Sequence, residues 1–374
     1  MPRAPKRKHD SGRKHDSGRK RFAGTGCYHY HSELGEGADS VVMKYVLGDE
    51  EKDSVYVKEV AVKEVVLVDD EDEDEGLERR ARLDREIEVH TQVTGHRLFP
   101  ELYFVDNSED ESARLFMELG PTSLESYICM HGHQQVQVPT PLIRSYMHQL
   151  LSALKVLHDK QILHGDVKPG NLLLFPDGSL KIIDFNRSVS EFEPLAIKLN
   201  PVGTMPYNAP EVLCGFTRFD YSVDLWAAGM TMLHMWYGRP FVEADGVCSD
   251  TTCRCEKSVV QQMAGMLGRP PKILLRKWSD DALRIPNMPA RPNQNRWLPV
   301  STENGDTSRD WLYFSKMTPV IKDFLDTIFH WDPTQRPTVE QLLAHPYFSP
   351  LRRSKAIPLP RDLAPPDRVP HYHP

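Results

Sequence analysis

The sequence predicts a soluble α+β protein with two or three folded units. Its 374 residues are 40% hydrophobic and 26% charged, which suits a globular chain, and a domain usually takes about 100–200 residues. Apolar residues at 60–63 and 115–119 predict strands, whereas residues 83–90 have helical spacing. Because both patterns occur, we expect a mixed fold.

The most informative segment is the run His-Gly-Asp-Val-Lys-Pro-Gly-Asn at residues 164–171. It places Asp166, Lys168 and Asn171 on one short loop, and Asp184 follows after a hydrophobic hairpin. Phosphoryl transfer uses such a set. A carboxylate orients the acceptor hydroxyl, a lysine lies near the migrating phosphate, and an asparagine and a second aspartate hold Mg²⁺.

This loop resembles the catalytic loop of protein kinases, and residues 184–186 resemble their metal-binding DFG motif. Two positions depart from the family, because Gly165 stands where arginine is usual and Asn186 where glycine is usual. Asparagine tolerates left-handed backbone angles better than other non-glycine residues, so the second change is mild. The resemblance implies a bilobal protein kinase fold, with a small β-rich N-lobe at about 28–119 that includes one helix and a larger, mainly helical C-lobe at about 120–348.

Residues 34–42 resemble the glycine loop that covers the phosphates of ATP. Gly35 and Gly37 match its first two glycines, while Ser40 replaces the third. Taken alone this pattern also suits an ordinary hairpin turn. The resemblance implies ATP contacts from residues in and around this loop, namely Leu34, Gly35, Gly37, Val42 and Ala61.

Lys63 ends an apolar, β-branched strand downstream of that loop. The resemblance implies that Lys63 orients the α- and β-phosphates and that Glu86, in a helical Arg-Glu-Ile context, holds it by an ion pair. A solvated lysine at a strand edge is the alternative, which the preceding glycine loop disfavours. Glu88 is a rival to Glu86, but two residues along a helix it faces another direction, so we expect it in solvent.

Further motifs follow in the order of the family, and the resemblance covers roughly residues 28–348. Residues 115–120 resemble the strand and hinge that bind adenine through backbone groups, which implies contacts from Glu118 and Gly120, with Leu173 as a further apolar wall. The activation segment is the stretch between Asp184 and Glu211, and its end at 203–211 also resembles the family. Three structural residues are implied by the remaining motifs: Glu211 and Arg336 as an ion pair, and Asp224 at the start of a buried helix.

The resemblance further indicates the serine/threonine class, since Lys168 and Thr204 match residues that support the catalytic aspartate in that class. It implies protein substrates with Ser or Thr acceptors, and ATP and Mg²⁺ as cofactors. Residues 262–271, in an insert at about 240–318, resemble the cyclin-dependent and MAP kinase group. Asn208 replaces the arginine usual there, so we do not predict a preference for proline after the acceptor.

Two classes of function stay open, an active kinase and a pseudokinase that acts as a nucleotide-binding or scaffolding module. All the charged catalytic groups are present, which favours the enzyme. Asn186 is the best argument for the second class, because glycine there lets the backbone flex around the metal-binding aspartate. The divergence of the two motifs suits a viral kinase.

The activation segment also departs from the family. A loop phosphate usually pairs with the arginine that Gly165 replaces, and residues 191–203 contain no Ser, Thr or Tyr. We therefore expect activity without phosphorylation of this segment, with its apolar residues holding it by packing. Those residues are Phe192, Leu195, Ile197 and Leu199.

The two ends of the chain differ from the domain at 28–348. Residues 1–21, within an arm at 1–27, hold nine Lys or Arg and two Asp, and with few apolar residues we expect disorder. Binding of an import receptor is our favoured role for them, and nucleic-acid binding the weaker one. The proline-rich tail at 349–374 predicts extended chain.

The compartment follows from two absences in the sequence. No apolar stretch is long enough for a bilayer, so we expect no membrane association. The six cysteines form no regular framework, which suits a reducing compartment. We therefore expect an intracellular location, nuclear, cytoplasmic or both.

Overall fold

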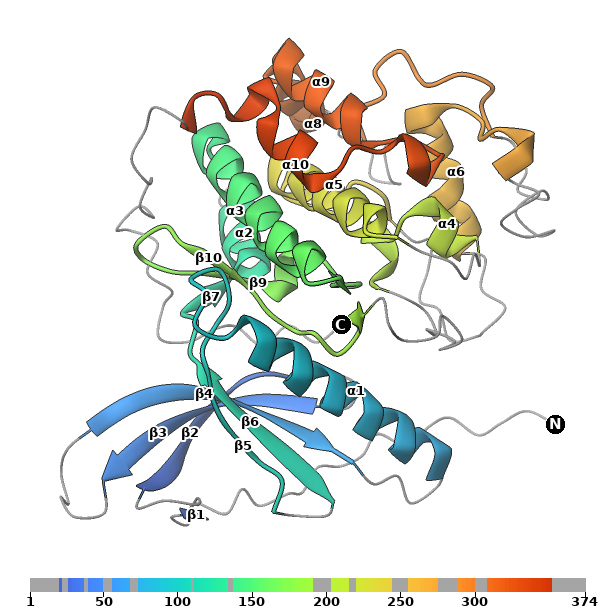
Figure 1. Cartoon of the computed structure of the whole chain (residues 1–374). Helices are drawn as coiled ribbons and strands as arrows, with labels where there is room; N and C mark the ends of the chain where they lie inside the picture. Colours follow the sequence, from blue (N-terminus) through green and yellow to red (C-terminus); the bar gives the residue numbers. More distant parts are fainter. Residues whose placement is uncertain are drawn as a thin grey trace. The chain divides into compact units, whose positions relative to one another are not determined.

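The computed structural model describes residues 20–21, 26–36, 40–49, 56–67, 73–108, 111–133, 137–190, 203–214, 220–243, 255–274, 288–299 and 308–351. By its internal contacts the chain forms two compact units. One comprises Met1–Arg79 and Leu102–Leu119, and the other Arg80–Glu101 and Gly120–Pro374. Figure 1 shows the strands of the first unit and the helices of the second.

The first unit is an antiparallel sheet with strand order β1-β2-β3-β4-β6-β5. Valines in β4 favour extended backbone, and its Val60 and Val62 form a small core with Phe116 of β6. Phe104 stacks on Phe116 with ring centroids 4.0 Å apart. The strands are β1 Lys20–Arg21, β2 Gly26–Glu36, β3 Ser40–Asp49, β4 Tyr56–Val66, β5 Leu102–Asp106 and β6 Ser112–Glu118.

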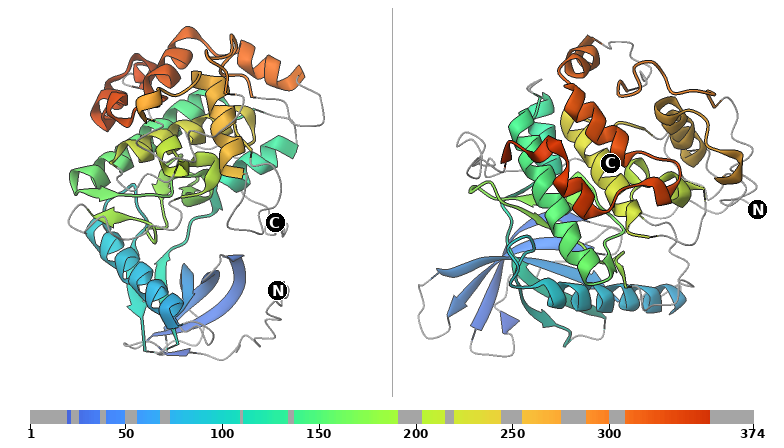
Figure 2. Two further views of the ribbon diagram at one scale, coloured as in Figure 1. Left: turned by 90° about the vertical axis from the view of Figure 1, so that its right-hand side faces the viewer. Right: turned by 45° about the horizontal axis from the view of Figure 1, so that its top comes forward.

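The second unit is mainly helical and is built around α5, Ser222–Tyr237, which is buried along its whole length. A helix that is apolar on all sides belongs in a core. Helix α3, Thr140–Asp159, lies beside α5 (Figures 1 and 2). Its buried residues Ile143, Met147 and Leu150 recur every three or four positions, as expected for one helical face.

The remaining elements of the second unit are short. The helices are α2 Leu124–His133, α4 Pro210–Leu213, α6 Cys255–Leu267, α8 Ser308–Ser315, α9 Pro319–Ile328 and α10 Val339–Ala344. The strands are β7 Thr122–Ser123, β8 Ile162–Leu163, β9 Leu172–Leu174, β10 Leu180–Ile182 and β11 Val189–Ser190. Strands β9 and β10 form the hydrophobic hairpin that leads to Asp184.

Helix α1, Glu73–Val93, begins inside the acidic run at 69–75. Acidic residues in a first turn complement the positive end of the helix dipole, which favours a start at this position. Val89 and Val93 of the same helix belong to the core of the second unit. The first unit therefore does not contain Arg80–Glu101, which the predicted N-lobe at 28–119 includes. In the prediction and in the structure alike, the chain passes to the helical unit after Leu119.

A sheet-rich unit and a helical unit confirm the α+β, bilobal prediction. The basic arm contributes strand β1, in which Lys20 pairs with Tyr28 of β2. The described ranges leave out residues 1–19, the tail from residue 352 on, and 244–254, 275–287 and 300–307 of the insert. The predicted packing of the activation segment by Phe192, Leu195, Ile197 and Leu199 also lies outside the described residues. Among the residues that the structure describes, no helix is both long enough and apolar enough to cross a membrane.

Candidate active site

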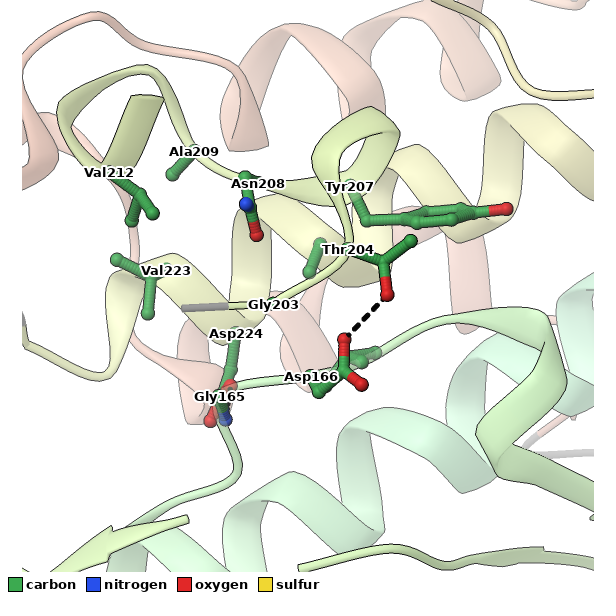
Figure 3. A pocket seen from close by; sticks show the side chains of 12 residues that line it. Gly165, Asp166, Gly203, Thr204, Tyr207, Asn208, Ala209, Val212, Val223 and Asp224 are labelled. Atoms are coloured by element: carbon green, nitrogen blue, oxygen red, sulfur yellow. Dashed lines mark hydrogen bonds between the residues drawn. The ribbon is translucent and has the colours of Figure 1, made fainter. Parts of the chain in front are cut away.

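Asp166 and Lys168 of the catalytic loop contact each other and Thr204, which lies at the end of the activation segment. Asp166 is 4% exposed, and its Oδ2 accepts a hydrogen bond of 2.8 Å from Nζ of Lys168. Its Oδ1 accepts one of 2.9 Å from Oγ1 of Thr204, the contact drawn in Figure 3. Lys168 Nζ also donates to Thr204 Oγ1 at 2.8 Å. The carboxylate is thus held on both oxygens by the loop and by the end of the activation segment.

Asn171 is oriented toward the same aspartate by its amide nitrogen. Its Nδ2 donates to the backbone oxygen of Asp166 at 2.8 Å and to Oδ2 of that residue at 3.3 Å. With the nitrogen used in this way, the amide oxygen Oδ1 is the atom left for other ligands. The backbone of Asn171 is fixed as well, because its carbonyl accepts from the amide of Ile183 at 3.0 Å.

Asp184 has an unusual backbone conformation, with a φ of +71°. A non-glycine residue in the left-handed region is strained by about 1–2 kcal/mol, and such strain gathers at functional sites. The neighbouring Phe185 is fully buried and packs edge-on against His164 and His90, with centroids 5.5 and 5.6 Å away. This packing of Phe185 holds the backbone of Asp184 in its left-handed conformation. The left-handed residue of this motif is Asp184, whereas Asn186 has no positive φ.

Asp224, at the start of α5, fixes the first half of the catalytic loop. Its Oδ2 accepts from the amide of His164 and from Nε2 of His158, and its Oδ1 accepts from the amide of Gly165, each at 2.9 Å. Burial by itself would raise the pKa of Asp224, but the hydrogen bond and charge of His158, with His164 and the Gly165 amide, lower it. Asp224 is therefore an ionised buried anchor.

The predicted pair of Glu211 and Arg336 is present and buried. Two parallel hydrogen bonds of 2.7 Å join the guanidinium to the carboxylate, and the two side chains are 0% and 1% exposed. The guanidinium also lies over the ring of Trp226, 4.9 Å from its centroid. The pair fixes the C-terminal end of the activation segment to α5 and to the loop that follows α9.

Tyr207 anchors the same end of the segment from another side. Its hydroxyl and Nδ1 of His234 on α5 share a hydrogen bond of 2.6 Å. Burial lowers the pKa of His234 to about 4, so this imidazole is neutral near pH 7. The sequence offered no signal for this contact.

Two predicted adenine-binding residues meet within the second unit. A Cβ atom on Gly120 would lie 2.6 Å from Cδ1 of Leu173. Any other residue at 120 would therefore displace Leu173, which explains the glycine at the end of the hinge.

The remaining predicted ATP-binding residues belong to the first unit, apart from Glu86. Lys63 is 7% exposed, and the register places it opposite Val42 on β3 and Leu115 on β6. Ala61 is buried, opposite Met117. Gly35 pairs with Val42, and Leu34 is exposed. Glu118 ends β6, whereas Gly37 lies outside the described residues.

Glu86 is 3% exposed on α1, and Glu88 on the same helix is exposed, as predicted. Glu86 belongs to the second unit and Lys63 to the first. The ion pair between them stays a prediction.

The comparison with protein families decides what this arrangement is. The family model described as "Protein kinase domain" matches residues 28–348. The chain belongs to the protein kinase family. The matched range is the one on which the motifs of this kinase were found, and the loop, metal-motif and segment-end residues described above all lie inside it.

Curated relatives of the kinase place it in the serine/threonine class, with likeness to MAP kinases. Mitogen-activated protein kinase MPS1 of Pyricularia oryzae (strain 70-15) is 28% identical over 327 residues, which are 86% of this chain and 70% of that protein. Mitogen-activated protein kinase spm1 of Cytospora mali has the same identity and coverage. Serine/threonine-protein kinase ssn3 of Aspergillus terreus is 28% identical over 258 residues, 64% of this chain and 59% of that protein.

Proposed function

We propose that this kinase transfers the γ-phosphate of ATP to Ser or Thr hydroxyls of protein substrates, with Asp166 as the group that orients and deprotonates the acceptor. The observation that carries the proposal is the contact of Asp166 with Lys168, Thr204 and Asn171. A carboxylate fixed on both oxygens presents one geometry to the acceptor, and positioning supplies much of the acceleration in phosphoryl transfer.

The donor set fits the cofactor that this chemistry needs. The amide oxygen of Asn171 and the carboxylate of Asp184 are hard oxygen donors of the kind that Mg²⁺ prefers, and Mg²⁺ commonly takes its other ligands from substrate phosphates and water. Among the described residues no cluster of three or more His, Cys, Asp or Glu could hold a metal ion. Bound Mg²⁺ would offset the negative charge of the transferring phosphoryl group.

Residues of the chain accept the proton, stabilise charge and bind ATP. As the acceptor oxygen bonds to the γ-phosphorus and the bond to ADP breaks, the hydroxyl proton passes to Asp166. Lys168 offsets negative charge beside it. We assign binding of ATP to Gly35 and Gly37 at the phosphates, to Lys63 with Glu86, to Leu34, Val42, Ala61 and Leu173 around adenine, and to the backbone of Glu118 and Gly120.

Partners and location are part of the proposal. The nine basic residues at 1–21 would bind an import receptor, and nucleic acid is the weaker candidate. We therefore propose an intracellular kinase that acts in the nucleus, the cytoplasm or both, on proteins with Ser or Thr acceptors.

The experiment is phosphate transfer to a generic basic protein by the full-length chain, with ATP and with or without Mg²⁺. We expect Mg²⁺-dependent phosphate on Ser and Thr, located by mass spectrometry, and a loss of turnover by orders of magnitude in Asp184→Asn. Binding of ATP without transfer in the wild type would favour the pseudokinase. Phosphate on Tyr alone would contradict the acceptor class.

A further inference from the structure

The two ends of the activation segment meet at Gly165. A Cβ atom on Gly165 would lie 2.6 Å from the backbone oxygen of Arg187, and Gly165 has a φ of +78°. From the other end, the Cβ position of Gly203 lies 3.2 Å from the backbone oxygen of Gly165. The absent side chain at 165 therefore makes room for the backbone of Arg187, and the absent side chain at 203 makes room for the backbone of Gly165. Figure 3 shows Gly165 and Gly203 together beside Asp166.

Arg187 joins these two ends through its side chain. Its Nη1 donates a hydrogen bond of 3.0 Å to the backbone oxygen of Gly203. The start of the segment is itself fixed, since Ser188 Oγ donates to the backbone oxygen of His164 at 3.2 Å and Val189 pairs with Leu163. Arg187, just before the anchored strand β11, thus extends to the far end of the segment.

Gly203, the residue that Arg187 holds, directly precedes Thr204. Thr204 donates to Oδ1 of Asp166 and accepts from Lys168, so the position of the Gly203 backbone sets the position of the catalytic carboxylate's partner. Arg187 therefore reaches Asp166 through Gly203 and Thr204. Its effect on chemistry would be indirect.

The pocket around Gly165 is small. It is lined by Gly165, Gly203, Asn208 and Asp224 among others and measures about 10 Å³, close to the space that one water molecule needs. Asn208 lies directly against Gly203, because a Cβ atom on Gly203 would clash with its Oδ1. An arginine side chain at 165 or a phosphate group in this pocket would require the segment to move.

We propose that Arg187 is a positioning residue that clamps Gly203 and Thr204 onto the catalytic loop, so that activity does not require phosphorylation of the activation segment. The proposal rests on the proposed kinase function. Three observations support it: the glycine at 165, the close approach of Arg187 and the absence of hydroxyl side chains at 191–203. In this arrangement the backbone oxygen of Gly203, which is neutral, accepts the hydrogen bond that a loop phosphate would otherwise accept.

The first test compares Arg187→Met with Arg187→Lys in the full-length chain. Both variants keep a long unbranched stem, but only lysine can donate to the Gly203 oxygen. We expect Met to lower kcat about tenfold or more, because small displacements of catalytic groups have such effects, with KM for ATP and Tm nearly unchanged. Lysine should restore part of the loss. Equal kcat for Arg187→Met and the wild type, or equal losses in both variants, would overturn the clamp.

The second test uses the fit at Gly165 and leaves Arg187 intact. Gly165→Ala and Gly95→Ala both place alanine at a positive φ, +78° and +81°, but only the first Cβ meets another atom within 4 Å. The two variants therefore carry similar backbone strain, and only Gly165→Ala also clashes with the backbone of Arg187. We expect Gly165→Ala to lower kcat about tenfold or more and Gly95→Ala to leave it unchanged. Equal kcat values in the two alanine variants would contradict the proposal.

The third test addresses phosphate directly. The purified kinase is treated with a broad phosphatase, the phosphatase is removed, and the initial rate is measured with mass spectrometry of the segment. We expect the initial rate to change less than about twofold. A loss of rate that follows dephosphorylation of Ser188, Ser190 or Thr204 would overturn the proposal. Absence of turnover above that of Asp166→Asn in every sample would instead reject the kinase function, and the clamp with it.

Discussion

At the scale of residues, the site depends on the three side chains that donate hydrogen bonds to the carboxylate of Asp166. Lys168 donates to one carboxylate oxygen at 2.8 Å, Thr204 to the other at 2.9 Å, and Asn171 to the first at 3.3 Å. A buried carboxylate with a fixed set of donors keeps one orientation, and loss of a single donor leaves an unsatisfied oxygen.

Thr204→Val should therefore lower kcat for protein substrates about tenfold to a hundredfold, since valine keeps the shape of threonine but cannot donate to Asp166. Thr204→Ser is the matched control, because it restores the hydroxyl, and it should retain most of the activity. Steady-state rates together with ATP binding, which should be unchanged, check this. Wild-type turnover in Thr204→Val would show that the contact has no part in catalysis.

Glu211→Gln removes the charge that balances a buried guanidinium, and such a break destabilises proteins by about 3–5 kcal/mol. The matched control is Glu340→Gln, which breaks the exposed pair of Glu340 and Lys155 and should change stability little. Urea unfolding of the two variants and the wild type measures both effects. Similar free energies of unfolding in the two variants would refute the structural role given to Arg336.

The motif residues in the catalytic loop could be named from the sequence because their chemistry depends on spacing along one short loop. The left-handed backbone of Asp184 could not, since it results from burial of Phe185 against His90 and His164, which lie far apart in the sequence. The bond from Arg187 to Gly203 was missed for the same reason.

At the scale of elements, α5 carries the catalytic loop through Asp224, while His158 on α3 contacts the same carboxylate. The sequence indicated the start of this buried helix. It did not indicate His158, because a histidine on a helix is usually an ordinary surface or core residue. Nor does the sequence determine the start of α1 at Glu73, since acidic runs suit both solvated loops and first turns of helices.

The link from α5 to the loop has a dependence on pH. The pKa of Asp224 is lowered in the folded protein, so the unfolded chain, with an aspartate pKa of about 3.9, takes up the proton first as pH falls. The stabilisation by Asp224 is then complete above about pH 4 to 5 and is lost at lower pH. The difference in unfolding free energy between wild type and Asp224→Asn should shrink as pH is lowered below 4. A difference that grows on acidification would mean that the sign of the shift is wrong.

At the scale of the whole molecule, charge separates the arm from the rest. The chain has a net charge of −7, although residues 1–21 contain nine basic side chains and two acidic ones. The family motifs predicted two lobes, and the predicted ATP-binding residues are divided between the two units of the structure. The membership of residues 80–101 in the second unit depends on tertiary packing of Val89 and Val93 and could not be predicted from local pattern.

Deletion of residues 1–19 should leave Tm nearly unchanged, because these residues offer few apolar side chains for burial. Kinase activity should also persist. Microscopy of the tagged full-length and truncated chains tests the import role, with reduced nuclear accumulation expected after truncation. Unaltered localisation would remove the import receptor from the list of partners.

The central claim is that Asp166 acts on the acceptor and does not hold ATP. Its most direct test is the rate of phosphate transfer at saturating ATP and Mg²⁺ for the wild type and Asp166→Asn, with ATP affinity measured on the same samples. We predict a loss of rate of about a hundredfold or more, with ATP affinity changed little. Wild-type turnover in Asp166→Asn would contradict the account.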